Sequence, residues 1–177
     1  MSTTTSTEEI LRIAEEIQRG GDPYEVPAEL LEEPREEKPA NRSLYARIAT
    51  MTVAEKIKLA LLGNREARAL LVRDSNRMIA RFVLRNPRLT EEEVLGFARN
   101  RNLDSEVLRD IGEHKTWPRN YQIRHALVTN PKTPLAIALH FVSSLHERDL
   151  RSLAKSKNVS ATIVTQARRI LAQRGKM

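Results

Sequence analysis

Two stretches of the chain resemble each other at a spacing of 44 residues, and this similarity constrains the fold more than any other sequence feature. The first stretch ends at Asn86-Pro87 and reads Asn-Arg-Met-Ile-Ala-Arg-Phe-Val-Leu-Arg-Asn-Pro. The second ends at Asn130-Pro131 and reads Asn-Tyr-Gln-Ile-Arg-His-Ala-Leu-Val-Thr-Asn-Pro. Apolar residues recur at helical spacing in both. Repetition at this length is typical of an α-solenoid, in which each unit buries its apolar face only against its neighbours.

The starts of the expected helices share a second pattern. An asparagine stands shortly before a Thr, Asp or Ser residue, and an apolar run follows. Thr, Asp and Ser are preferred N-cap residues because their side-chain oxygens accept hydrogen bonds from the first turn of a helix. The four asparagines of this pattern are Asn86, Asn102, Asn130 and Asn158.

Threonine begins three of the expected helices with a more specific capping signal. In two of them a glutamate follows three residues later, which is the spacing of a reciprocal capping box. In the third a proline follows directly, which predicts proline at the first helical position. The predicted caps are Thr52 with Glu55, Thr90 with Glu93, and Thr133 before Pro134.

The apolar pattern is helical throughout from about residue 43 onward, in pieces of about 9 to 13 residues. Six glycines, three Phe, three Tyr and one Trp are too few to favour a β architecture or a glycine-rich phosphate loop. No apolar run approaches the roughly 20 residues that a membrane-spanning helix needs. We therefore predict an all-α fold, a superhelix of short helices over residues 42–177.

The net charge of +7 hides two opposed parts. Residues 1–41 contain 11 acidic and four basic residues, for a net charge of −7, and residues 42–177 contain 26 basic and 12 acidic residues, for +14. This asymmetry predicts an acidic N-terminal tail beside a basic helical domain. The tail can lie on that domain, compete with a polyanionic ligand, or float free of it.

The tail has an internal organisation of its own. Ser6 and Glu9 have capping-box spacing, and an amphipathic helix is expected over about residues 7–19, ended by Gly20-Gly21. A proline-rich stretch follows, which we expect to be an extended and partly disordered linker. The helix can dock on a partner or on its own domain, or it can be only a marginal terminal helix.

Units of the form Asn130-Pro-Lys-Thr-Pro-Leu-Ala, followed by an amphipathic helix and another short helix, resemble leucine-rich variant repeats and, more loosely, HEAT repeats. The resemblance covers roughly residues 60–172. It implies a curved, right-handed superhelix with a groove-like surface. Some leucine-rich variant proteins have a cysteine cluster that holds an iron–sulfur centre, but this chain contains no cysteine, so we expect no cofactor.

Arginines fall in helical register along the expected domain. Arg77, Arg81 and Arg85 lie four residues apart, which places three like charges on one line of a helix, at a cost of a few tenths of a kcal/mol per pair. Successive units of a solenoid can align such positions into a basic track that binds nucleic acid phosphates, an acidic protein or the acidic tail. The alternative is an ordinary charged surface. The candidate track comprises Arg65, Arg68, Arg73, Arg77, Arg81, Arg85, Arg99, Arg101, Arg119, Arg124, Lys155 and Lys157.

The only tryptophan, Trp117, lies close to Arg119 and Tyr121. An exposed cluster of this kind is typical of a protein-binding hot spot or of a platform on which bases stack. The alternative is that Trp117 is a core residue where one unit meets the next.

The residue patterns of catalytic and metal sites are missing from the sequence. The four histidines, at positions 114, 125, 140 and 146, lack metal-ligand spacing, so no metal is expected. No nucleophile elbow, phosphate loop or dinucleotide fingerprint is present. A HEAT-like DNA glycosylase, with Asp74 or Asp110 as the catalytic carboxylate, is a remote alternative.

These observations favour a binding surface over an active site. We expect a non-enzymatic helical-repeat interaction module, a protein–protein scaffold or adaptor, with its N-terminal tail as a second contact point. The alternative is a nucleic-acid-binding module that uses its arginine-rich face. The N-terminus lacks the basic and apolar regions of a signal peptide, so we expect a cytoplasmic, bacterial-style protein.

Overall fold

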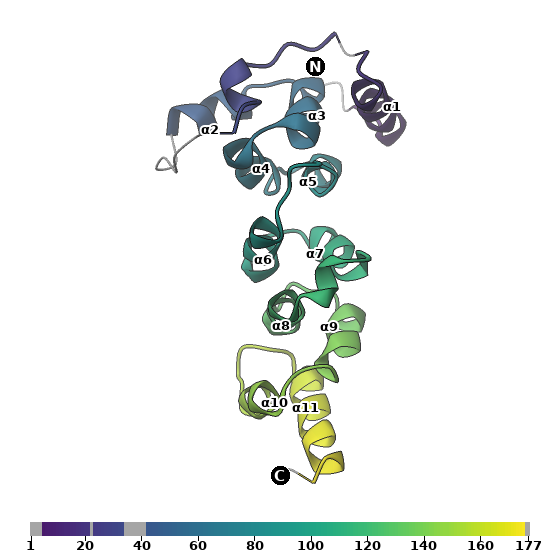
Figure 1. The fold of residues 1–177 in the computed structure, drawn as a ribbon, viewed down its shortest axis with the longest axis vertical. Helices are drawn as coiled ribbons and strands as arrows, with labels where there is room; N and C mark the ends of the chain where they lie inside the picture. Colours follow the sequence, from purple (N-terminus) through teal and green to yellow (C-terminus); the bar gives the residue numbers. More distant parts are fainter. Residues whose placement is uncertain (1–4, 22, 34–41, 176–177) are drawn as a thin grey trace. The chain divides into compact units, whose positions relative to one another are not determined.

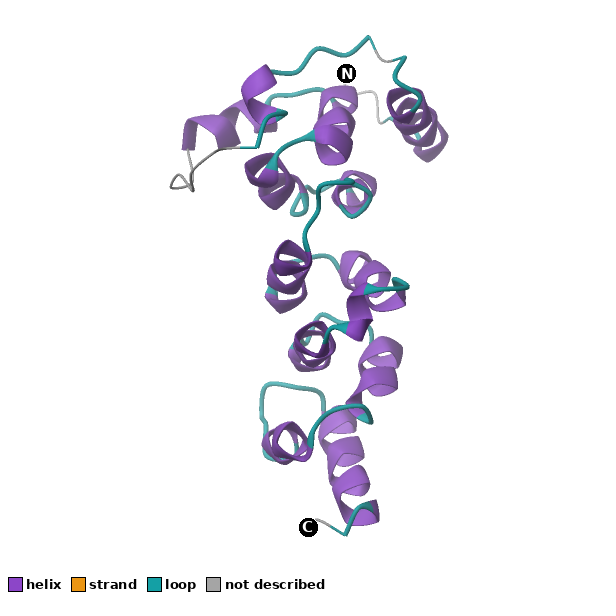
Figure 2. Ribbon diagram, viewed as in Figure 1, coloured by secondary structure: helices purple, strands orange, loops and turns teal. Residues whose placement is uncertain are grey.

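The computed structural model describes residues 5–21, 23–33 and 42–175. These residues form helices and irregular segments and no strands, which confirms the prediction of an all-α fold (Figures 1 and 2). No helix among them is long and apolar enough to cross a membrane. The helices are α1 (Thr7–Gln18), η1 (Ala28–Leu30), α2 (Arg42–Ala49), α3 (Val53–Leu62), α4 (Arg65–Leu71), α5 (Arg77–Val83), α6 (Glu91–Arg99), α7 (Ser105–Glu113), η2 (Trp117–Arg119), α8 (Tyr121–Thr129), α9 (Leu135–Val142), α10 (Glu147–Leu153) and α11 (Ala161–Gln173).

The chain divides into two compact units, Met1–Leu89 (unit 1) and Thr90–Met177 (unit 2). The expected boundary between residues 41 and 42 stays a prediction. In unit 1 the third helix of the set α3–α4–α5 packs on the first. Unit 2 contains two such sets, α6–α7–α8 and α9–α10–α11, and in each of them the third helix again packs on the first (Figure 1).

The N-terminal helix α1 packs on α3 within unit 1. Ile10, Ile13 and Ile17 lie on one face and are buried there. Ser6 caps the start, where its hydroxyl accepts a hydrogen bond from the Glu9 amide. Gly20 ends the helix with φ +78°, a left-handed conformation that strains any residue with a Cβ. Therefore α1 covers apolar surface of α3.

Threonine caps form at two of the three predicted positions. Both capping boxes, at the starts of α3 and α6, are present as predicted. The predicted Thr133 cap is wrong, because Pro134 itself has an extended backbone (ψ 134°) and is the N-cap of α9. The helix begins one residue later than expected, and the buried Thr133 hydroxyl has no hydrogen-bond partner within the described residues.

Buried asparagines close the junctions between helices. After α5, the Asn86 side-chain amide donates to the carbonyls of Ala60 and Gly63, at the end of α3, both at 3.1 Å. Its side-chain oxygen accepts from the Arg88 amide at 3.0 Å. One side chain therefore satisfies two carbonyls that helix α3 leaves unpaired, and it also fixes the turn that follows α5.

Asn130 makes the same set of bonds in unit 2, 44 residues later. Its side-chain amide donates to the carbonyls of Ala98 (2.8 Å) and Asn100 (3.1 Å), at the end of α6, and its oxygen accepts from the Lys132 amide at 2.9 Å. The interval from Asn86 to Asn130 spans three α-helices, α6 to α8, and the short helix η2. The Asn-Pro pairs found in the sequence are thus two copies of one junction.

Replacing Asn130 by Ala should destabilise unit 2 by about 1 to 3 kcal/mol, because the carbonyls of Ala98 and Asn100 lose their donor, one in a buried and one in a partly buried hydrogen bond. Trp117 lies in unit 2 and is the only tryptophan, so its fluorescence reports the unfolding of that unit in a denaturant titration. Asn158 is exposed, and Asn158→Ala is the matched control, expected to change stability by less than about 0.5 kcal/mol. Equal effects of the two variants would contradict the role given to Asn130.

Candidate functional site

The acidic stretch of residues 23–33 lies against α3 and α4 of unit 1. Leu30 inserts its side chain there and is only 1% exposed, while its carbonyl accepts from the Asn64 amide at 2.7 Å. The Asn64 side-chain amide donates to the carbonyls of Glu29 and Glu32, both at 2.9 Å. Lys58 donates to the Tyr24 carbonyl at 2.5 Å. Asn64 therefore binds this stretch as Asn86 and Asn130 bind the ends of helices.

The Glu33 carboxylate is the main charged contact of this stretch. One oxygen accepts from the Arg65 amide, at the start of α4, at 2.9 Å, and the other accepts from the Arg68 guanidinium at 2.6 Å. Arg88 lies 3.9 Å away. Partial burial would raise the pKa of Glu33, but the bonds from Arg68 and Arg65 and the charges of Arg68 and Arg88 together lower it below its ordinary value.

Arg88 links the acidic stretch to the end of α3. Its guanidinium donates to the carbonyl of Leu31, in the acidic stretch, at 2.7 Å, and also to the carbonyl of Leu62. Glu29 forms a further ion pair with Arg47 of α2. Two of the acidic side chains of this stretch, Glu29 and Glu33, thus meet arginines from several elements.

Several arginines donate hydrogen bonds to carbonyls at the ends of helices. Arg68 is 1% exposed and also donates to the Gly63 carbonyl, and Arg124 donates to the carbonyls of Pro118 and Arg119. On α11, Arg168 donates to the carbonyl of the residue that follows α10, and Arg174, directly after α11, donates to two carbonyls that follow α9. Short helices leave many terminal carbonyls, and a guanidinium can bridge two of them, which explains why the basic domain prefers Arg to Lys.

The candidate basic track of the sequence is therefore only partly a surface. Arg68 lies inside unit 1, and Arg124 is occupied by carbonyls. Arg85 follows the end of α5 and lies over the Phe82 ring, 5.3 Å from its centroid. The track residues with exposed side chains are Arg65, Arg73, Arg77, Arg85, Arg99, Arg101, Arg119, Lys155 and Lys157.

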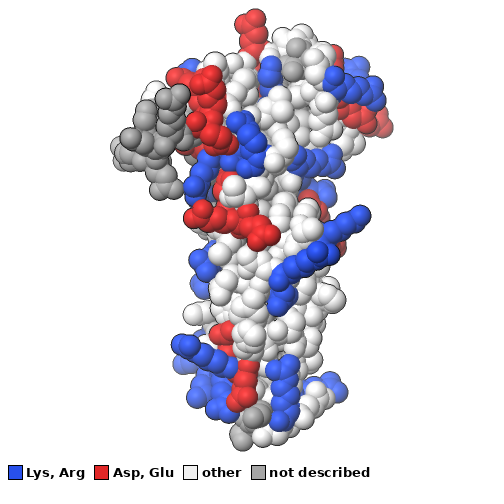
Figure 3. Space-filling model, viewed as in Figure 1, with Lys and Arg blue, Asp and Glu red and all other residues white. Residues whose placement is uncertain are grey.

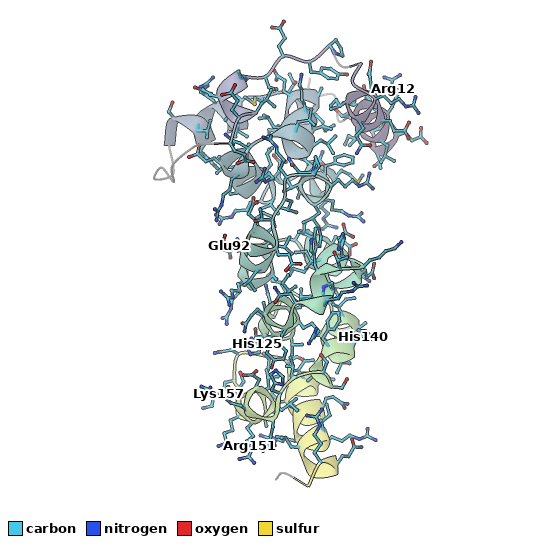
Figure 4. The ribbon with its side chains drawn as sticks, in the orientation of Figure 1. Arg12, Glu92, His125, His140, Arg151 and Lys157 are labelled. Carbon is cyan, nitrogen blue, oxygen red and sulfur yellow. The ribbon has the colours of Figure 1, made fainter. Side chains whose placement is uncertain are left out.

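Unit 2 carries a set of exposed basic side chains for which the described residues provide no carboxylate. After Glu113 the sequence has only two acidic residues, Glu147 and Asp149, and both have partners: Glu147 pairs with Arg151 at 2.6 Å, and Asp149 accepts from the Tyr121 hydroxyl. Figure 3 shows this charge distribution on one face, and Figure 4 shows Arg151 and Lys157 on the α10 side of unit 2. The members are Arg99, Arg101, Lys115, Arg119, Lys132, Arg148, Lys155, Lys157 and Arg169.

Trp117 and Tyr121, the predicted hot spot, are both engaged within unit 2. Trp117 is buried and stacks on His114 with ring centroids 3.6 Å apart, which agrees with the alternative of a core residue. Tyr121 is half-buried, stacks on His146 at 4.1 Å, and its hydroxyl accepts from the His146 amide. Burial and then the hydrogen bond to Asp149 raise the pKa of Tyr121, so this hydroxyl keeps its proton.

The remote catalytic candidate Asp74 has a structural role. Its carboxylate accepts from Lys56 at 3.0 Å and from the Asn76 amide at 2.8 Å, so it joins α3 to the start of α5. Asp110 lies half-buried on α7. In the part of the chain that the structure describes, no three His, Asp or Glu side chains are placed to hold a metal ion.

Comparison with known proteins adds no family. No protein-family model matches the chain, and neither the curated proteins nor the solved structures searched gave a match. The resemblance to leucine-rich variant and HEAT repeats therefore stays a prediction.

A titration of Glu33 should report its contact with α4. The pKa of Glu33 is lower in the folded chain than in the unfolded one. The contact therefore stabilises the folded chain fully at pH values above the ordinary pKa of a glutamate, and this stabilisation disappears as the pH falls through the lowered pKa. NMR of the Glu33 carboxyl carbon and of the Arg65 amide should give one common midpoint, below the ordinary pKa of a glutamate. In Glu33→Gln the Arg65 amide should lose this transition. An ordinary pKa for Glu33 would contradict the described contact.

Proposed function

We propose that this chain is a non-enzymatic helical-repeat module, an α-solenoid of HEAT-like or leucine-rich variant type, that binds acidic segments of other proteins. The observation that carries the proposal is the chain's own acidic stretch, which Asn64, Arg68 and Arg88 hold at the α3–α4 junction. A junction that binds an irregular acidic segment in the same chain has the donors and cations needed to bind one from a partner.

The repeat part of the proposal rests on the matching junctions. Asn86 and Asn130 donate to the ends of α3 and α6 with nearly equal distances, and in all three helix sets the third helix packs on the first. Repeated local packing of this kind is the principle of a solenoid. The 44-residue interval holds three helices, whereas the HEAT-like unit suggested by the sequence has two.

The proposal assigns no reaction to the chain. Of the two carboxylates considered for catalysis, Asp74 is bonded to Lys56 and to a backbone amide, which leaves it a structural role. The interaction module therefore needs only a surface that holds acidic segments, as the α3–α4 junction of unit 1 does.

Nucleic acid binding is the second candidate. The exposed basic residues of unit 2, such as Lys155, Lys157 and Arg169, are favourable for phosphates because no carboxylate within the described residues neutralises them. Trp117 is buried, so it supplies neither base stacking nor a protein-binding hot spot, and it does not separate the two candidates.

The two candidates differ in their response to salt and to nuclease. A protein partner with an acidic segment should be captured from a nuclease-treated lysate by the full chain, and the cross-linked peptides should be acidic. Nucleic acid binding instead predicts an affinity for RNA or DNA oligonucleotides that falls steeply between about 50 and 200 mM salt. Loss of the captured protein on nuclease treatment would contradict the protein-binding proposal.

A further inference from the structure

The junction that holds the acidic stretch in unit 1 has a counterpart in unit 2. Asn86-Pro87-Arg88 and Asn130-Pro131-Lys132 occupy the same place 44 residues apart. In both, the asparagine oxygen accepts from the amide of the basic residue, at 3.0 and 2.9 Å, while its amide donates to the end of an earlier helix. Lys132 is therefore the positional equivalent of Arg88.

Arg88 shows what this position does when an acidic segment is present. It donates to the Leu31 carbonyl at 2.7 Å, and its guanidinium lies 3.9 Å from the Glu33 carboxylate. A basic residue at this place thus contacts both the backbone and a carboxylate of the segment that crosses the junction.

The backbones of three basic residues come together at the equivalent place in unit 2. Arg99 is the last residue of α6, and Arg101 follows the Asn100 carbonyl to which the Asn130 amide donates. The same Asn130 side chain binds the Lys132 amide. One asparagine therefore joins the backbones next to all three cations, and their side chains are exposed, with no carboxylate partner within the described residues.

The two junctions differ at the start of the next helix. In unit 1 the cap of α4 is the neutral Asn64, and Glu33 accepts from the first amide of that helix. In unit 2 the cap of α7 is the carboxylate of Asp104, which accepts from the Glu106 amide at 2.9 Å and has no amide to donate to a peptide. The Glu106 carboxylate is turned to Arg109, at 3.3 Å. A second carboxylate at the start of α7 would be repelled, so an acidic ligand of unit 2 must place its charges on the three cations instead.

We propose that the α6–α7 junction of unit 2, formed by Arg99, Arg101 and Lys132, binds an acidic peptide segment of a partner protein, as the α3–α4 junction binds residues 23–33 within the chain. This inference rests on the proposed function and specifies its site and the chemistry of its ligand. The ligand is an irregular peptide with at least two carboxylates a few residues apart, as Glu29 and Glu33 are.

A direct binding assay with the full chain tests this site. The probe is a fluorescently labelled peptide with the sequence of residues 25–33. The control is the same peptide with every Glu replaced by Gln. Lys132→Glu and Arg101→Glu should each weaken binding of the acidic peptide by about tenfold or more, the effect of about 1.4 kcal/mol. Lys155→Glu, a charge reversal at the end of α10, is the matched control and should stay within about twofold. The Gln peptide should bind at least tenfold more weakly than the Glu peptide, on the same basis.

Backbone amide shifts locate the bound peptide. At the proposed site the amides of Asn100, Arg101 and Lys132 should move on addition of peptide. A change in the amide shifts of Asn64 and Arg65 alone would mean that the added peptide replaces the chain's own residues 23–33 in unit 1. That result would overturn the proposed site in unit 2.

The outcomes separate this inference from the broader proposal. Binding that is equally weakened by Lys155→Glu and Lys132→Glu overturns the site, while the module still binds an acidic peptide. Absence of peptide binding overturns the inference, and the lysate capture then decides the broader proposal by itself. A single-stranded RNA that binds and loses affinity in Lys132→Glu, with no peptide binding, would assign the cations to nucleic acid and overturn the inference as well.

Discussion

The bond from a buried asparagine side chain to two carbonyls at the end of an earlier helix is the interaction on which the rest of this structure depends. The α-helices of the described residues have 7 to 13 residues, so a large share of their carbonyls lie in the last turn and have no partner within the helix. Asn86 and Asn130 supply donors to these carbonyls, and Arg68, Arg168 and Arg174 supply others. Without such donors, burying the helix ends against one another would leave unpaired polar groups and cost the folding free energy that the apolar contacts provide.

The same chemistry connects the fold to the proposed function. Asn64 binds the acidic stretch in the same way as Asn86 binds the end of α3. Each side-chain amide donates to a pair of carbonyls that lie three residues apart. The stretch adds carboxylates, and the arginines that otherwise close helix ends then bind these as well. At the α3–α4 junction, side-chain donors of the kind that close helix ends thus also hold an irregular peptide segment.

The sequence predicted the helical fold, the amphipathic N-terminal helix and both capping boxes, because these depend on local patterns of three to seven residues. The sequence did not predict that Arg68 is buried. Arg68 lies on the same face of α4 as the apolar residues Ala67 and Leu71, which are buried too. Charge was taken as a sign of exposure, and the partner that permits burial, Glu33, lies 35 residues away in sequence.

The Thr133 cap failed because the backbone of the following proline was extended. The carbonyl partners of Arg124, Arg168 and Arg174 had no local signal either, since most of these bonds cross between helices. The basic character of unit 2 was visible in the sequence. Only the hydrogen bonds of Asn130 show which basic residues have backbones close to one junction.

The most direct test of this account is the exchange of asparagine side-chain amide protons in the full chain, followed by NMR. The account predicts that Asn64, Asn86 and Asn130 have slowly exchanging side-chain amides, since each donates to two backbone carbonyls, whereas the exposed Asn102 and Asn158 exchange at the rate of a free amide. Exchange of all five at the same fast rate would contradict it, because the junctions would then be held by apolar packing alone.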